Sequence, residues 1–231
     1  MIRYLALHLA GPLQAWGDSS RFDLRETLQF PTKSGICGIL LAASGDSGPQ
    51  CELLEQLAAA ELTIFSIGGK QAKLHDFHMV GNGYDESDKW QNLNAPKKSD
   101  GSKPNGGGAR LTHRYYLQDA DFWAVYALPD ELAEKFAAAL QKPVFDLYLG
   151  RKNCAPTEMI CGGLFESEEC AFERVREYVG SKGSPEVTVI RDAKPGEDDT
   201  FYLNDVPVQF GIHKRYRDRC VKMEPFPVEK K

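Results

Sequence analysis

Residues 9–43 read LAGPLQAWGDSSRFDLRETLQFPTKSGICGILLAA, and this stretch joins the end of an apolar strand to the start of an apolar helix. Apolar residues alternate through residues 2–9, a pattern that predicts a first strand. Thr32 or Ser34 can cap the free backbone N–H groups of the helix that follows. A helix start with a lysine beside it attracts anions, so Lys33 and Ser34 are candidates for phosphate contacts. Capping and solvation alone are the alternative interpretation.

The loop inside this stretch carries one flat aromatic side chain and two arginines, Trp16, Arg21 and Arg25. This combination suits a nucleic acid, because bases stack on aromatic rings and phosphates pair with cations. Trp16 can instead fill a gap between the loop and the sheet. Both interpretations of this side chain stay open at this point.

The order of these residues resembles that of the CRISPR-associated protein family five, which belongs to the RAMP superfamily. The resemblance rests on five segments: LAGPLQAWG at 9–17, FPTKSGICGILLAA at 30–43, DFHMVG at 76–81, RYYLQDA at 114–120 and LYLGRKNC at 147–154. It is dense up to Cys154 and thin beyond it. The PLQAWG and LYLGRKNC segments are similar to the type I-E branch, whose members are subunits of the interference complex Cascade.

Residues 1–150 show the order strand, helix, strand, strand, helix, strand once a long insertion is removed. The predicted strands are 2–9, 62–67, 122–128 and 144–149, and the predicted helices are 35–43, 51–60 and one that starts at 129–130. This βαββαβ order is the α+β arrangement of ferredoxin-like and RRM-type domains. Because many functions use this fold, the fold alone does not decide the function.

An insertion over residues 70–117 interrupts this order. Its centre, residues 81–109, is rich in Gly, Asn, Asp, Ser and Lys, and so long a loop inside a domain is usually functional or disordered. Its edges, residues 73–80 and 110–117, are predicted to be the two strands of a projecting β-hairpin arm. The family resemblance implies the same feature, a thumb-like arm.

Residues 151–231 are predicted to form a mostly β C-terminal extension. A helix is expected over 167–179, and short strands are expected over 186–191, 200–203 and 206–210. We expect these strands to form a C-terminal sheet that packs beside the first domain. The run HKRYRDR at 213–219 is the most basic segment of the chain.

The net charge of −5 argues against a free-standing nucleic-acid-binding protein, because such proteins tend to be basic. It fits a subunit whose acidic faces dock onto basic neighbours. The sequence has no run of about 18 apolar residues that would predict a membrane span. It also has no basic region followed by an apolar core that would predict export. We therefore expect a cytoplasmic protein with no membrane contact, in which most of the six cysteines are reduced.

Neither a metal nor another cofactor is expected. The cysteines form no C-x-x-C pair, and no histidine lies at zinc-finger spacing from them. His75 and His78 are three residues apart in a predicted strand. Their side chains therefore point to opposite faces and cannot chelate one ion.

Further candidate RNA contacts lie at the base of the arm and after the last predicted strand of the domain. Arginine pairs with phosphate oxygens through two parallel hydrogen bonds, and a glycine at position 150 permits close backbone approach to RNA. A solvated surface is the alternative for each position. The full set of candidate RNA-binding residues is Trp16, Arg21, Arg25, Lys33, Ser34, His78, Arg110, His113, Arg114, Arg151 and Lys152.

The resemblance implies a non-catalytic subunit of a type I CRISPR interference complex. Such a subunit binds and caps the 5′ handle of mature CRISPR RNA, and it contacts the large PAM-reading subunit and the first backbone subunit. The arm is implied to displace one guide nucleotide from pairing. Because base pairing of the guide reads the target DNA, we expect this chain to meet DNA only indirectly.

The alternative is a metal-independent endoribonuclease that processes precursor CRISPR RNA. Such cleavage needs a base for the 2′-OH and an acid or cation for the leaving 5′-oxygen, and His113 with Tyr115 or Tyr116 can supply them. Family members in type I-C systems process their own precursor, whereas type I-E members leave this step to a separate endonuclease. The similarity to the type I-E branch therefore favours a protein without catalytic residues.

Overall fold

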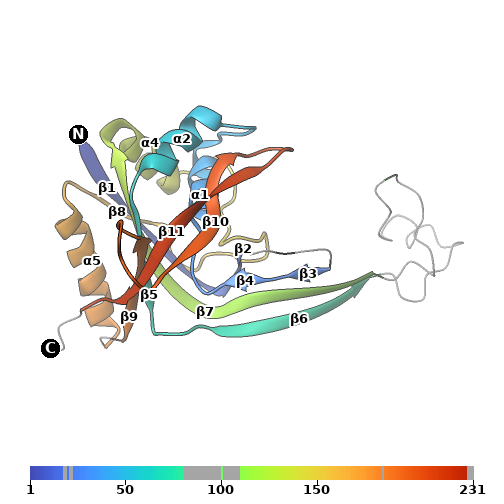
Figure 1. Ribbon diagram of the computed structural model, residues 1–231. Coiled ribbons are helices and arrows are strands. Elements are labelled where there is room, and N and C mark those ends of the chain that lie inside the picture. Colours follow the sequence, from blue (N-terminus) through green and yellow to red (C-terminus); the bar gives the residue numbers. More distant parts are fainter. Residues whose placement is uncertain (18–19, 21–22, 81–99, 101–109, 184, 228–231) are drawn as a thin grey trace, which may run out of the picture.

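The computed structural model describes residues 1–17, 20, 23–80, 100, 110–183 and 185–227 (Figure 1). Arg21 and the centre of the insertion, apart from Asp100, lie outside these ranges, so the expectations about them are not addressed by the structure. Arg110 is described as the first residue of a strand, through its backbone alone.

One large antiparallel sheet organises the protein. Its strands follow the order β10-β11-β9-β5-β7-β1-β8, and each neighbouring pair in this order is antiparallel. The bounds are β1 (Ile2–Gln14), β5 (Leu62–Ile67), β7 (Arg110–Pro129), β8 (Cys161–Phe165), β9 (Val187–Asp192), β10 (Thr200–Gln209) and β11 (Arg215–Pro225). Two short strands, β2 (Trp16–Gly17) and β4 (Thr27–Leu28), pair separately.

Helices cover both faces of the sheet (Figure 1). The four helices among the described residues are α1 (Lys33–Ser44), α2 (Cys51–Ala59), α4 (Asp130–Gln141) and α5 (Glu168–Ser181). Helices α1, α2 and α4 pack on one face against Leu5, Leu7 and Leu9 of β1, and α5 packs on the other face near Ala6. Burying each such leucine stabilises the fold by about 1.5–3 kcal/mol. This makes β1 a central strand buried on both sides.

Most of the predicted elements of the first 150 residues are confirmed, with small shifts of their ends. The strand over 62–67 has the predicted bounds, and the first strand runs on to Gln14. The helix predicted over 35–43 is α1, which begins at Lys33 because Thr32 caps it. The protein is therefore a mixed α/β protein, as expected.

The strand predicted over residues 144–149 is wrong. The N–H groups of Val144 and Phe145 donate instead to the carbonyls of Ala43 and Ala42 at the end of α1. The place beside β1 is taken by β8, whose sequence begins Cys161-Gly162-Gly163. A Cβ at Gly162 would come within 2.6 Å of the Trp123 ring, so glycine is required there and an apolar strand pattern is missing.

The expectation of a separate C-terminal sheet is also wrong. Strand β9 pairs with β5, so β9, β11 and β10 continue the same sheet across residue 150. The strands expected over 200–203 and 206–210 are one strand, β10, with a register shift between Leu203 and Val206. Strand β11 was not predicted, because its first residues are the charged run rather than an alternating apolar pattern.

The arm strands are confirmed at their predicted positions. Strand β6 (Ala72–Val80) pairs with the first half of β7 from Ala72 opposite Gln118 to Val80 opposite Arg110. This hairpin projects away from the helices (Figure 1). The short strand β3 (Leu24–Arg25) runs parallel to β7 on its other edge. The second half of β7 lies inside the sheet, between β5 and β1, so the arm and the core share one strand.

Among the described residues, no helix has the length and apolar character needed to cross a bilayer.

Candidate nucleic-acid interface

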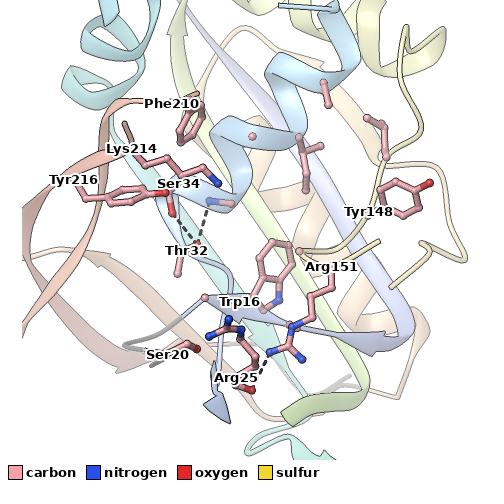
Figure 2. A pocket seen from close by; sticks show the side chains of 18 of the residues that line it. Trp16, Ser20, Arg25, Thr32, Ser34, Tyr148, Arg151, Phe210, Lys214 and Tyr216 are labelled. Atoms are coloured by element: carbon pink, nitrogen blue, oxygen red, sulfur yellow. Dashed lines mark hydrogen bonds between the residues drawn. The ribbon is translucent and has the colours of Figure 1, made fainter. Parts of the chain in front are cut away.

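An open pocket of about 650 Å³ lies beside the first turns of α1 (Figure 2). Its walls come from the start of α1, the residues after β1, the loop over residues 146–151 and the turn between β10 and β11. The polar and aromatic side chains that line it include Arg25, Ser34, Tyr148, Arg151, Lys214 and Tyr216. Segments that are far apart in the chain therefore meet at one helix start.

The first turn of α1 is organised by hydroxyl groups. The Thr32 Oγ1 atom accepts a hydrogen bond of 3.1 Å from the Gly35 N–H, and the Ser34 hydroxyl donates to Thr32 Oγ1 at 3.2 Å. Thr32 is therefore the cap, and Ser34 faces the pocket (Figure 2). A Cβ at Gly35 would come within 2.9 Å of the Trp16 ring, so only glycine lets the helix approach the indole so closely.

Trp16 forms part of the floor of the pocket rather than an open stacking surface. Its side chain is only 1% exposed, and its indole N–H donates to Gln14 Oε1 at 3.1 Å. Gln14 in turn donates to the carbonyls of Leu9 and Ala120, which locks this part of the loop to the sheet. The expectation that Trp16 stacks on a base is therefore wrong, and the gap-filling interpretation applies.

Lys33 does not face the pocket. Its side chain is buried, with 1% of the residue exposed, and its ammonium group donates to the carbonyls of Ala58 and Ala60 at the end of α2. Burial lowers the pKa of this ammonium group, while the Asp192 carboxylate 3.9 Å away raises it. The expected phosphate contact of Lys33 is therefore wrong, because the lysine is already used to join α1 to α2.

Arg151 lies at the junction of the pocket and the arm. Its guanidinium group donates to the carbonyls of Tyr115 and Arg25, at 3.0 and 2.9 Å, and lies 4.7 Å from the centre of the Tyr116 ring. Gly150 has a φ of 97°, and a Cβ there would lie 1.8 Å from the Ala15 carbonyl oxygen. The predicted close backbone approach is therefore real, but its partner is the protein backbone. Lys152 is exposed next to it.

Three further candidates lie on one face of the arm. Strand register places Arg114 opposite Asp76 and beside Arg25, with His78 one pleat further along the same face. Since Arg25 also lines the pocket, this face continues from the pocket onto the arm. We call Arg25, Arg114, Arg151 and His78 the cationic face, although histidine carries charge only when protonated.

His113 lies on the opposite face of the arm, within a stack of rings. His75 and His113 are 5.1 Å apart and parallel, with a 2.9 Å hydrogen bond between His75 Nε2 and His113 Nδ1. Tyr115 stacks on His75 at 4.6 Å, and Phe77 lies 5.2 Å from His113. The structure thus separates His113 from Arg114, so the predicted residues do not form one site.

The wall formed by the β10–β11 turn was not assigned to the site from the sequence. Lys214 and Tyr216 extend from this turn toward α1 (Figure 2), and burial raises the pKa of the Tyr216 hydroxyl. The signal in the sequence was the basic run at 213–219, but its place beside α1 depends on the sheet order. Arg25, Arg151 and Lys214 outnumber the two carboxylates of the pocket, Glu26 and Asp146. The pocket is therefore cationic within an acidic chain.

In the part of the chain that the structure describes, no three His, Cys, Asp or Glu side chains group closely enough to hold a metal ion. His75 and His78 lie on opposite faces of β6, as their spacing requires.

Two solved structures share this fold. One, described as a CRISPR RNA-guided surveillance complex, has a TM-score of 0.77 and 26% identity, with 97% of this chain and 90% of that chain covered. Another, described as the crystal structure of a Cas protein, has a TM-score of 0.69 and 28% identity, with 98% and 96% covered. The fold is therefore that of a CRISPR-associated protein.

Sequence comparison narrows this class to one family. The family model described as CRISPR-associated protein (Cas_Cas5) matches residues 4–222. The chain is also 31% identical over 180 residues to the CRISPR system Cascade subunit CasD of Escherichia coli (strain K12), with 73% of this chain and 74% of that protein covered. The chain belongs to the Cas5 family of CRISPR-associated proteins, which confirms the resemblance found in the sequence.

Proposed function

We propose that this chain is a non-catalytic subunit of a type I CRISPR interference complex that binds and caps the 5′ handle of CRISPR RNA. The observation that carries the proposal is the pocket where three cations and two tyrosines converge on the start of α1, at the base of the arm. A cationic pocket in a chain of net charge −5 favours an anionic ligand, and membership of the Cas5 family points to RNA.

The pocket has the two kinds of group that grip single-stranded RNA. Arg25 and Lys214 are exposed cations that can pair with phosphates, and Tyr148 and Tyr216 offer rings on which bases can stack. Stacking contributes about 1–3 kcal/mol for each base. The cationic face offers the RNA a path from the pocket onto the arm. Ser34 adds a hydroxyl group at the start of α1.

The arrangement of the sheet supports a ferredoxin-like domain in this role. Strands β8, β1, β7 and β5 are adjacent and antiparallel, with α1 and α4 between successive strands of the chain. This is the order expected of a split βαβ unit. We propose that residues 1–165, which include β8, form this ferredoxin-like domain and that the 70–117 hairpin is its thumb. The residues after β8 extend the domain and add Lys214 and Tyr216 to the pocket.

The proposed role includes partners beyond RNA. The relative from Escherichia coli is named as a subunit of Cascade, so we propose that this chain contacts a large PAM-reading subunit and backbone subunits. Target DNA is met only indirectly in this scheme, because the guide RNA pairs with it. The cytoplasm is the compartment that such a complex requires.

One observation favours the alternative function of an endoribonuclease. The hydrogen-bonded pair His75 and His113 is exposed on the arm, and two imidazoles within reach of one phosphate can act as base and acid. Tyr115 stacks on this pair, whereas Tyr116 is buried and accepts a hydrogen bond from Asn153. Tyr116 is therefore not available for cleavage, and the alternative rests on the histidines and Tyr115.

One experiment separates the two functions. The purified chain is mixed with end-labelled repeat–spacer RNA in EDTA, crosslinked with ultraviolet light and run on a denaturing gel. We expect a shifted band of full-length RNA that depends on the handle and weakens in a Lys214→Ala, Tyr216→Ala variant. Lys142→Ala, at the exposed end of α4, is the matched control. A shorter product that disappears in His113→Ala would establish the enzyme instead.

A further inference from the structure

A buried ionic cluster lies where the β10–β11 hairpin meets the start of α1. Arg219 donates to both oxygens of Asp205, from Nε to Oδ1 at 2.7 Å and from Nη2 to Oδ2 at 2.8 Å. Its Nη1 donates to Asp192 Oδ1 at 2.9 Å. Asp205 Oδ2 also accepts the backbone N–H of Lys33 at 2.8 Å. One carboxylate therefore joins both strands of the hairpin to the first residue of the helix.

The cluster is charged although it is buried. Asp205 is 4% exposed and Arg219 is 9% exposed, so both groups have left water. Such burial costs several kcal/mol per ion unless geometry and hydrogen bonds compensate, and a pair of apolar residues often stabilises as well. Unlike apolar contacts, however, hydrogen bonds are directional and so fix the relative positions of the groups that they join. The fork of Arg219 and the N–H of Lys33 fix where Asp205 lies along α1.

The residues fixed in this way lead directly to the pocket. Asp205 of β10 lies five residues before Phe210, which follows the end of that strand, and Arg219 lies three residues after Tyr216 along β11. The register shift between Leu203 and Val206 turns Asp205 toward the helix. Beyond the cluster, the Phe210 N–H donates to the Pro49 carbonyl at 3.1 Å. The ion pair between Asp205 and Arg219 thus fixes the base of the hairpin whose turn region carries Lys214 and Tyr216.

We infer that Asp205 and Arg219 are positioning residues, which hold the β10–β11 hairpin against the start of α1 so that Lys214 and Tyr216 complete the RNA pocket. This inference rests on the proposed function of that pocket. It also explains why the most basic run of the chain has mixed roles. Lys214 faces the ligand, whereas Arg219 of the same run is buried and serves the fold.

The test compares Asp205→Asn with Arg191→Gln in the full chain. Arg191 of β9 forms ion pairs with Glu224 of β11 and with Glu197 of the loop between β9 and β10, away from the pocket, so its variant controls for general loss of stability. We expect Asp205→Asn to weaken binding of handle RNA about tenfold, the effect of losing one stacked base or phosphate contact. Arg219→Lys keeps the charge but loses the fork, and it replaces Asp205→Asn if that variant does not fold.

Two further readouts separate positioning from stability. Without RNA, amide hydrogen exchange in residues 210–216 is expected to accelerate in Asp205→Asn but not in Arg191→Gln. In the RNA-binding assay, adding Lys214→Ala to Asp205→Asn is expected to cause little further loss of affinity. Both substitutions act through the same contact between Lys214 and the RNA. Additive losses, or unchanged exchange in the turn, would overturn the inference. If Lys214→Ala alone leaves binding intact while exchange in the turn still accelerates, the pocket's function fails and the positioning stands.

Discussion

Replacing Lys33 by methionine separates the buried role of this lysine from the phosphate contact that its position in the sequence suggests. Methionine keeps the length of the stem but leaves the carbonyls of Ala58 and Ala60 without their donor. An unsatisfied buried acceptor costs about 1–3 kcal/mol, and this change leaves two of them. Asp192, 3.9 Å from the ammonium group, is 40% exposed and keeps its ion pair with Arg219, so it adds little to the loss. We therefore expect the variant to lose about 2–6 kcal/mol of unfolding free energy.

Urea denaturation followed by tryptophan fluorescence measures this loss. In a chain of this size, each kcal/mol lowers the melting temperature by about 2–4 °C, so a fall of about 4–24 °C is expected. The salt dependence of RNA binding, measured below the new melting temperature, is expected to keep its slope. Losing one phosphate contact would reduce the slope by about 0.7 on a log–log plot.

The control is Lys142→Met, since Lys142 is exposed at the end of α4. A loss below about 1 kcal/mol in Lys33→Met, together with a reduced slope, would refute the buried role, because it would mean that Lys33 reaches the RNA.

Two other predictions concern the pocket rim and the far strands. Gly150→Ala is expected to lower the melting temperature in differential scanning fluorimetry, because its Cβ would lie 1.8 Å from the Ala15 oxygen. The control is Gly183→Ala, which measures backbone strain alone, since Gly183 has a φ of 84° but open space around it. Equal falls in melting temperature would contradict the clash at Gly150. The hydrogen bonds from Arg191 lower the pKa of Glu197 to about 2. Because this value lies below the ordinary 4.5, the stability that Glu197 contributes is present above pH 4.5 and is lost as pH falls toward 2. In Arg191→Gln, carbon-13 NMR titration is expected to show a higher pKa for Glu197, still held below its ordinary value by the Lys194 N–H, and an unchanged pKa would exclude this pairing.

Local patterns predicted those elements whose signals are local. The strand over 62–67 and the helix after Thr32 were identified because alternation and a capping hydroxyl are read within a few residues. Strand β8 was missed because Gly162 is required by its contact with Trp123, which no local pattern records. A strand was predicted over 144–149 instead, because the apolar residues of the loop after α4 look the same as a short buried strand.

The same distinction between local and long-range signals holds for the residues of the site. The helix start, Arg25 and Arg151 were found in the sequence, and they line the pocket. Lys33 was misassigned because its ammonium group donates to the carbonyls of Ala58 and Ala60, at the end of another helix. Lys214 and Tyr216 were in a run recognised as basic, but only the sheet order brings that run to α1. Burial and long-range pairing, rather than residue type, decide which cations are free to bind.

The continuity of β7 gives the arm a mechanical character. No loop separates the arm from the core, because β7 forms one side of the hairpin and then continues into the sheet between β5 and β1. At its base it is clamped by β6 on one edge and by β1 and β3 on the other. Residues 110–119 span about 33 Å at the usual rise of a strand. The arm is therefore joined to the core by one strand rather than by a loop, so we expect it to hold a set distance from the pocket.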